Sequence, residues 1–147
     1  MKVSEAMTRD VMLIHANQSI EEAAALMEDC DIGSLPVADS DRLIGMITDR
    51  DIAVRAVAKG QGPDTPVSQV MSKEVLYCFE DDDVKNVAKN MSDIQVRRLP
   101  VVTREKKLVG ILSLGDLARK SESRTAGEAM KGISKPSEQH SQTAGAH

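Results

Sequence analysis

The fold is decided by one stretch, Gly45-Met46-Ile47-Thr48-Asp49-Arg50-Asp51. Its apolar lead-in predicts a strand that ends at Ile47, and Thr48 follows as the N-cap of a helix. A threonine with an acid three residues later resembles a capping box, in which hydroxyl and carboxylate each accept a hydrogen bond from a backbone N–H of the first turn. A single copy of this pattern predicts a helix start and nothing more.

The same step occurs again at Gly110-Ile111-Leu112-Ser113-Leu114-Gly115-Asp116. The residues around it recur too, since Met7, Met27 and Pro36 return 64 positions later as Met71, Met91 and Pro100. Gly45 and Asp51 return 65 positions later, which places one inserted residue in the second hairpin turn, where insertions are tolerated. The sequence therefore predicts an internal duplication with two copies.

Each copy is predicted to hold a short helix, a strand, a helix, a hairpin and a last helix. The first copy has a helix at Val3–Met7, a strand at Val11–His15, a helix from Ile20, strands at Ser34–Ala38 and Leu43–Ile47, and a helix from Thr48 to Gly60. The second copy has a helix after Thr65-Pro66, a strand at Val75–Phe79, a helix after Asp81–Asp83, strands at Arg98–Val102 and Leu108–Leu112, and a helix from Ser113 to Lys120. We expect domains at 2–60 and 65–120, joined by a linker at 61–64.

The tail at 121–147 is polar and rich in small residues, which predicts disorder from about Ser134 onward. One part of it, Gly127-Glu128-Ala129-Met130, echoes Ser4-Glu5-Ala6-Met7. Two alternatives remain open for this part: a short helix near 125–132 that docks on the core, or a solvated tail.

Composition excludes several classes of function. With a net charge of −4 over 147 residues, and Tyr77 and Phe79 as the only aromatic residues, the chain favours neither phosphate neutralisation nor base stacking, so we expect no nucleic acid partner. We find no signal peptide and no apolar run of membrane-spanning length. Cys30 and Cys78 lack paired spacing, which favours a reducing, cytoplasmic location and small apolar roles for both residues.

The two copies resemble a tandem pair of cystathionine-β-synthase (CBS) domains, the arrangement called a Bateman module. The resemblance rests on Asp31–Val37 with Gly45–Ile52 and on Gln95–Val101 with Leu108–Leu117, and it covers residues 2–120. We expect no fused catalytic domain, so the chain is similar to stand-alone bacterial members of the hypoxic-response type. The resemblance implies an α+β fold of two tandem β-α-β-β-α repeats with pseudo-twofold symmetry. It also implies a homodimer, and clefts between the repeats that bind AMP, ADP, ATP, NAD or S-adenosylmethionine.

The repeated step has chemistry that fits such ligands. The two oxygens of an ionised carboxylate match the two cis hydroxyls of a ribose, so Asp51 and Asp116 are the predicted ribose ligands. Thr48 and Ser113 begin helices, where hydroxyl and backbone N–H groups favour a phosphate. By resemblance, the adenine would lie against the strand starts near Val11 and Val75 and against the segments before Pro36 and Pro100.

The two copies differ before these prolines, where Arg97-Arg98 of the second copy replaces Gly33-Ser34 of the first. An arginine that points into the cleft would make a fork-shaped phosphate contact, but neighbouring strand residues face opposite sides, so at most one should do so. Arg50 and Arg55 would add positive charge near the first step, and a solvated surface is the alternative for all four arginines. Gly115 of the second step stands at the position of Arg50 in the first, and its missing side chain permits another group to approach the backbone more closely. The resemblance does not imply that both sites are functional, so one degenerate site is an open alternative.

Catalysis has no support in the sequence, because no phosphate loop, nucleophile elbow or His-Glu-x-x-His motif is present. His15, His140 and His147 are not clustered with other ligands, so we predict no metal site and no required cofactor. The leading hypothesis is a non-enzymatic sensor that binds an adenosyl nucleotide as a regulatory ligand and acts on an unknown protein target. The alternative is a ligand-independent scaffold for protein interactions.

Overall fold

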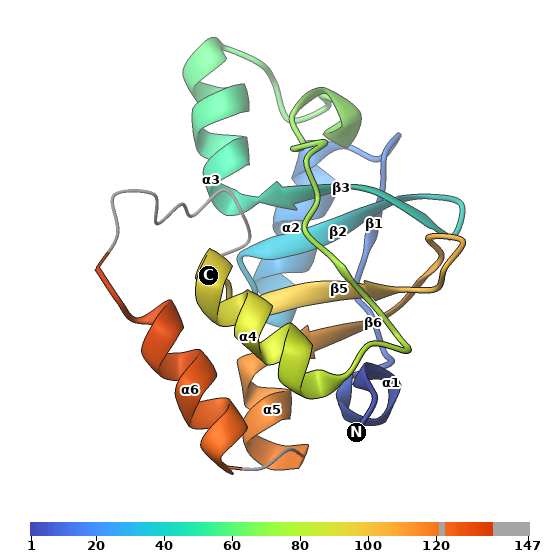
Figure 1. Cartoon of the computed structure of the whole chain (residues 1–147). Helices are drawn as coiled ribbons and strands as arrows, with labels where there is room; N and C mark the ends of the chain where they lie inside the picture. The colour runs from blue at the N-terminus through green and yellow to red at the C-terminus, as the bar shows by residue number, and fades with distance from the viewer. Residues whose placement is uncertain (121–122, 137–147) are drawn as a thin grey trace. The chain divides into compact units, whose positions relative to one another are not determined.

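A computed structural model describes residues 1–120 and 123–136, with the side chains of 123 and 124 left out (Figure 1). The described chain divides into two compact units. We call Met12–Val75 the central unit, and Met1–Val11 together with the chain from Leu76 onward the terminal unit. The part of the predicted disordered tail from 137 onward lies outside the described residues.

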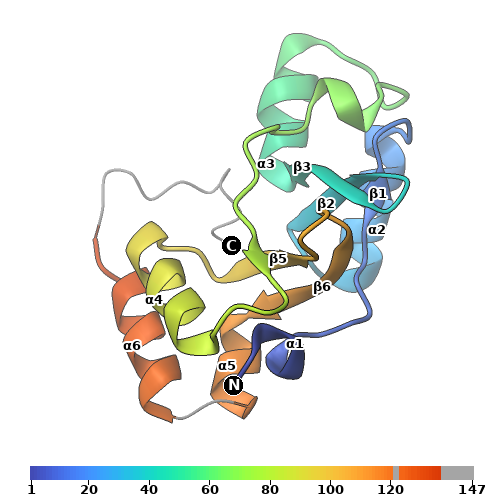
Figure 2. The ribbon, with the colours of Figure 1, turned by 45° about the vertical axis from the view of Figure 1, so that its right-hand side comes forward.

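The central unit is a three-stranded sheet with helices after its first and third strands (Figure 2). The strand order is β1-β2-β3, with β1 parallel to β2 and β2 antiparallel to β3. The elements are β1 (Ile14–His15), α2 (Ile20–Cys30), β2 (Ser34–Asp39), β3 (Arg42–Thr48), α3 (Asp49–Asp51), η1 (Ile52–Ala56), η2 (Val57–Lys59) and η3 (Val67–Gln69).

The terminal unit repeats this topology with the order β4-β5-β6. Its elements are α1 (Val3–Ala6), β4 (Cys78–Phe79), α4 (Val84–Ile94), β5 (Arg98–Val102), β6 (Leu108–Ser113), α5 (Leu114–Lys120) and α6 (Ser123–Ile133). The predicted α+β class and the doubled β-α-β-β-α order are confirmed. The predicted first strand of each copy was too long, because only two residues of it pair with the neighbouring strand.

Local signals in the sequence explain the helix ends. The hydroxyl of Ser19 accepts a hydrogen bond from the N–H of Glu22 and so begins α2. Helices α2 and α4 both end at a left-handed residue, Asp31 with φ 53° and Gln95 with φ 57°. These two residues are 64 positions apart, so the duplication extends to the backbone conformation of the helix ends.

The head of each copy packs in the unit that contains the other copy's sheet. Thr8 forms two backbone hydrogen bonds of 2.9 Å with Ile111 in β6. Ser72 forms the equivalent pair with Met46 in β3, at 2.8 and 3.0 Å. The chain therefore enters the central unit after Val11 and leaves it after Val75, so each compact unit combines one copy's sheet with the other copy's head.

Glycine permits this close approach in both units. An added Cβ at Gly45 would lie 2.6 Å from the sulfur of Met71, and at Gly110 it would lie 2.5 Å from the sulfur of Met7. The methionines and glycines that define the repeat in the sequence are thus partners in space, but across copies.

Each unit has its own apolar core. The core of the central unit includes Ile14, Leu35 and Ile47, which are at most 2% exposed. The core of the terminal unit includes Met91, Leu112 and Leu117, all fully buried.

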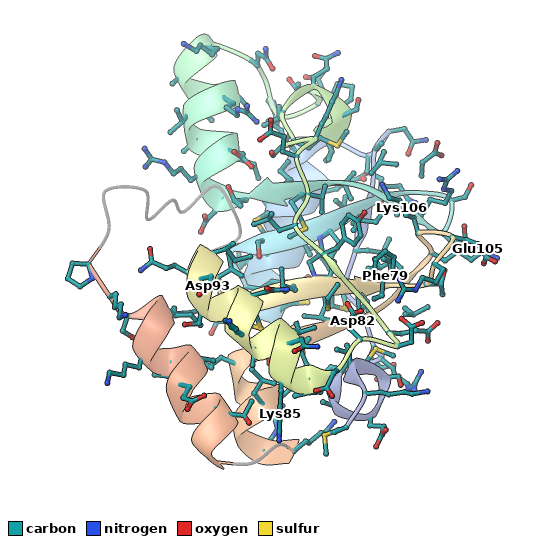
Figure 3. All side chains as sticks on the ribbon, viewed as in Figure 1. Phe79, Asp82, Lys85, Asp93, Glu105 and Lys106 are labelled. Atoms are coloured by element: carbon teal, nitrogen blue, oxygen red, sulfur yellow. The ribbon has the colours of Figure 1, made fainter. Side chains whose placement is uncertain are left out.

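The β5–β6 turn is held to the segment around β4 by charge and ring contacts. Figure 3 labels Phe79 of β4 and Glu105 and Lys106 of the turn. Arg104 donates two hydrogen bonds to Asp81, at 2.8 and 3.2 Å, and its guanidinium lies 4.0 Å from the centre of the Phe79 ring. These hydrogen bonds hold the pKa of the exposed Asp81 carboxyl below its usual value. The Lys106 ammonium lies over the ring of Tyr77, so both aromatic residues contact charged side chains of this turn.

Candidate functional site

The first hydroxyl–carboxylate step forms a complete capping box in the central unit. The Thr48 hydroxyl accepts from the N–H of Asp51 at 3.0 Å, and the Asp51 carboxylate accepts from the N–H of Thr48 at 3.0 Å through Oδ2. Both side chains are buried, with Thr48 0% and Asp51 1% exposed. The predicted helix start is therefore correct at the atomic level.

The second step forms the same box in the terminal unit. Ser113 Oγ accepts from the N–H of Asp116 at 3.1 Å, and Asp116 Oδ2 accepts from the N–H of Ser113 at 3.0 Å. Asp116 is 1% exposed, as Asp51 is. The two steps thus place equivalent carboxylates in equivalent positions.

Each step lies beside the strand start that the sequence predicts to contribute to the same site. Ser34 pairs with Thr48 across the hairpin, and the carbonyl of Gly33 accepts from the N–H of Asp49 at 3.0 Å. In the terminal unit Arg98 pairs with Ser113, and the carbonyl of Arg97 accepts from the N–H of Leu114 at 2.9 Å. The hairpin register therefore brings these residues to their steps.

The four arginines predicted near the two steps are all exposed. Arg97 and Arg98 are both exposed, and so is Arg50, and their roles toward a ligand stay predictions. Arg55 makes defined contacts, because its Nη1 donates to the carbonyls of Val70 and Met71 at 3.2 Å each. The same nitrogen lies 3.9 Å from Asp51 Oδ1.

Val11 and Val75 are half-buried and lie at the two points where the chain passes between units. Each follows by three residues the head residue, Thr8 or Ser72, that bridges a hairpin. Their proposed contact with adenine stays a prediction.

Thr8 contacts a candidate site residue, and the sequence did not predict this contact. Its hydroxyl donates to Asp116 Oδ1 at 3.1 Å, although the two residues are 108 positions apart. A signal did exist, because Ser72 lies 64 positions after Thr8 and repeats the hydroxyl. Arg119 was missed as well, and it pairs with Asp116 Oδ1 at 2.6 Å.

Other reactive groups do not form a site among the described residues. Burial, with a smaller contribution from Asp82, raises the pKa of the Cys78 thiol to about 12, so this thiol stays protonated at neutral pH. Within residues 1–120 and 123–136, no group of three or more His, Cys, Asp or Glu side chains is arranged to hold a metal ion. None of the helices in that part of the chain is long and apolar enough to cross a membrane.

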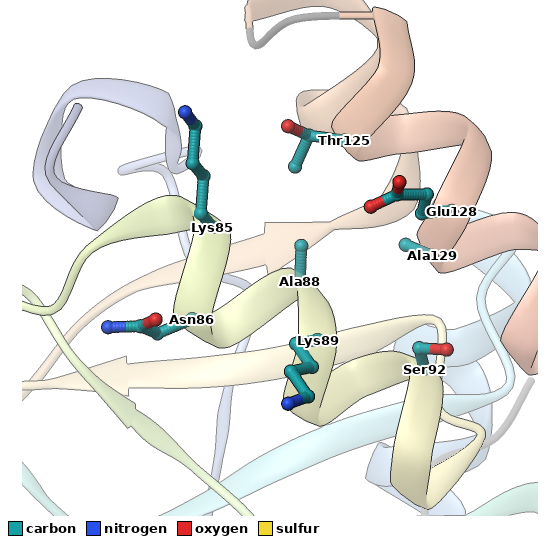
Figure 4. Close-up of a pocket in the computed structure, with 8 residues that line it drawn as sticks. All are labelled: Lys85, Asn86, Ala88, Lys89, Ser92, Thr125, Glu128 and Ala129. Atoms are coloured by element: carbon teal, nitrogen blue, oxygen red, sulfur yellow. The ribbon is translucent and has the colours of Figure 1, made fainter.

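A cavity of about 560 Å³ lies between α4 and α6 in the terminal unit (Figure 4). Its lining includes Lys85, Lys89 and Ser92 of α4 and Thr125 and Glu128 of α6. None of the predicted site residues lines this cavity, so it is separate from the repeated step.

Comparison with known families places both copies in one group. The family model described as CBS domain matches residues 3–57 and 67–123. The CBS domain-containing protein YhcV of Bacillus subtilis is 42% identical over 133 residues, which cover 90% of this chain and 94% of YhcV. Hypoxic response protein 1 of Mycobacterium tuberculosis is 33% identical over 134 residues, which cover 90% of this chain and 93% of that protein.

Two similar solved structures contain adenosine compounds. The CBS domain pair of protein MJ0100, in complex with 5′-methylthioadenosine and S-adenosyl-L-methionine, is 32% identical, with a TM-score of 0.67 and coverage of 81% of this chain and 94% of that chain. CBSX2, in complex with AMP, is 25% identical, with a TM-score of 0.69 and coverage of 80% and 93%.

Proposed function

This chain belongs to the CBS-domain family, and we propose that it is a regulatory module that binds an adenosine-containing ligand and has no catalytic activity of its own. The relatives of nearly equal length support this, since the chain covers 94% of YhcV and 93% of hypoxic response protein 1. AMP and S-adenosylmethionine, bound by similar CBS structures, share a ribose with two vicinal hydroxyls.

The repeated capping box is the observation that carries the proposal. In each unit the helix start holds one carboxylate oxygen and leaves the other oxygen, Oδ1, outside the box. A carboxylate held in this way accepts hydrogen bonds from a diol with little loss of side-chain entropy, because its position is already fixed. Asp51 and Asp116 are the two candidate ribose ligands, at least one of which binds the diol, and Thr48 and Ser113 are the candidate neighbours of the phosphate.

A bound ligand would act by changing the relative populations of two conformations of the chain. A ligand that binds one arrangement of the chain more tightly than another shifts the equilibrium by its differential affinity for the two. We further propose that the chain is a cytoplasmic homodimer that passes this shift to a protein target. The exposed apolar side chains of Val54 and Val57, 45% and 66% exposed, support self-association through the helical segment after α3.

Titration of the full chain, stripped of bound nucleotide, tests the proposal. We expect AMP, ATP, NADH or S-adenosylmethionine to raise the melting temperature and to release heat on binding. The double variant Asp51→Asn/Asp116→Asn should abolish both effects, because asparagine keeps an acceptor for the capping box but loses the charge. Asp93→Asn, an exposed change in α4, is the matched control and should bind like the parent chain.

Two results would contradict the sensor. If none of the four compounds at millimolar concentration changed the melting temperature or released heat, the ligand-independent scaffold for protein interactions would be the remaining hypothesis. Conversion of a bound nucleotide into a new compound, detected by chromatography after incubation, would show an enzyme. Light scattering measures the mass in solution and tests the dimer independently.

A further inference from the structure

The two carboxylates differ at the oxygen that lies outside the capping box. Asp116 Oδ1 accepts two hydrogen bonds from the chain itself, from the Thr8 hydroxyl at 3.1 Å and from the Arg119 guanidinium at 2.6 Å. Asp51 Oδ1 is buried and accepts none. The equivalent atoms of the two copies are therefore in opposite states, one with internal donors and one without.

The guanidinium of Arg55, which lies near Asp51 Oδ1, does not supply the missing hydrogen bond. Arg55 Nη1 lies 3.9 Å away, beyond hydrogen-bonding distance, and donates instead to the carbonyls of Val70 and Met71. The guanidinium stabilises the carboxylate charge electrostatically but leaves the lone pairs of Oδ1 without a donor. A buried polar atom in this state calls for a ligand, water or ion as its partner.

Three sequence differences explain why the terminal unit has internal donors and the central unit does not. Ser72, the equivalent of Thr8, donates its hydroxyl to the carbonyl of Glu74 at 3.4 Å. Val54 stands at the position equivalent to Arg119, so it supplies no donor.

The third difference is inside the step itself, where the central unit has Arg50 and the terminal unit has Gly115. A Cβ at Gly115 would lie 3.2 Å from Arg119 Nη1, so the missing side chain leaves room for the guanidinium over the first turn of α5. The helices also differ after the step, since Asp51 leads into the π-helical segment η1 and Asp116 continues a regular α-helix.

We infer that the two halves of this module are unequal: Asp51 receives the vicinal diol of the ligand's ribose, and Asp116 is closed by the chain's own Thr8 and Arg119. The Thr8 hydroxyl occupies the carboxylate oxygen that a ribose hydroxyl would use, and the Arg119 guanidinium neutralises its charge. The chain then binds a single adenosyl ligand. This inference rests on the proposed function and assigns Thr8 and Arg119 the role of specificity-determining residues.

Calorimetric titration with AMP as the probe tests which half binds, using the nucleotide-free full chain. We expect a single ligand per chain, loss of binding in Asp51→Asn, and unchanged binding in Asp116→Asn. Two equivalent ligands per chain, or loss of binding in Asp116→Asn alone, would overturn the inference while leaving the proposed function standing. Absence of binding in the parent chain with every adenosine compound would overturn the proposed function as well.

A ligand-side measurement covers the case in which Asp51→Asn fails to fold. Replacing AMP by 2′-deoxy-AMP removes one of the two hydroxyls, and we expect binding to the parent chain and to Asp116→Asn to weaken by about tenfold or more, the scale of a lost hydrogen bond to a charged group. Equal affinity for the two compounds would contradict a diol bound by Asp51.

The closed half supplies a gain-of-function test. Thr8→Val/Arg119→Val removes both internal donors and gives position 119 the residue that the central unit has at its equivalent, Val54. We expect this variant to bind a second AMP that is lost again when Asp116→Asn is added. A stoichiometry that stays at a single ligand in a folded variant would show that Thr8 and Arg119 do not close the site.

Discussion

Gly45 and Gly110 are positions in the two hairpins where one added methyl group should reduce stability. Beyond the methionine sulfurs, a Cβ at Gly45 would lie 2.9 Å from the carbonyl oxygen of Ser72, and at Gly110 3.0 Å from that of Thr8. A methionine side chain can move aside. These carbonyls cannot do so cheaply, because each accepts a backbone hydrogen bond from the neighbouring strand.

We therefore predict that Gly45→Ala and Gly110→Ala each lower the free energy of unfolding by about 1–3 kcal/mol, the usual cost of overpacking. Urea denaturation measures this change. Gly62→Ala in the linker is the matched control, since among the described residues the one atom near its Cβ belongs to the flexible side chain of Asp64. Equal stability of Gly110→Ala and Gly62→Ala would show that the head segments do not pack tightly on the hairpins.

At the scale of residues, the sequence predicts what depends on neighbours along the chain. A hydroxyl and an acid three positions apart predicted both capping boxes, and the structure confirms them. The contact between Thr8 and Asp116 was not predictable from spacing, because 108 residues separate them and either copy's head fits either sheet by pattern alone.

At the scale of elements, the helix that follows Thr48 was predicted correctly at both ends but not in its interior. It begins with the predicted cap and ends at Gly60, whose φ of 77° fits the predicted C-terminal glycine. Between them the backbone passes from α to π to 3₁₀ geometry. Apolar periodicity cannot distinguish these hydrogen-bonding patterns, because their side-chain periods are too similar over so few residues.

Helix α6 depends on one glycine for its contact with α4. A Cβ at Gly132 would overlap the hydroxyl of Ser92, and the side chain of Gln95 donates to the carbonyls of Gly132 and Lys135 at 3.3 and 2.6 Å. We predict that Gly132→Ala lifts α6 from α4, which hydrogen exchange would detect as faster exchange of the α6 amides.

Gly127→Ala in the same helix is the control. No atom of another described segment lies within 4 Å of its Cβ position, so alanine should stabilise α6 by about 0.5–1 kcal/mol through its higher helix propensity. If both variants slow exchange alike, α6 does not pack at Gly132 as the structure describes.

At the scale of the whole molecule, the repeat in the sequence and the compact units in space do not have the same boundaries. Arithmetic on recurring methionines, prolines and glycines predicts two copies of one fold, and the family match agrees. The same arithmetic does not predict that Val3–Met7 lies in the terminal unit, which contains the sheet of the second copy. Both heads carry the same apolar pattern, so only three-dimensional packing decides which sheet each one covers.

The exchanged heads mean that the covalent linker is not what keeps the two copies together. A chain cut between Gly62 and Pro63 would give two fragments, each carrying the head that completes the other's compact unit. We predict that the fragments, expressed separately, reconstitute a folded complex by complementation and co-elute in size exclusion. Removing residues 1–11 from the first fragment should weaken this association. After the cut, the module would therefore persist as a non-covalent complex of its two fragments.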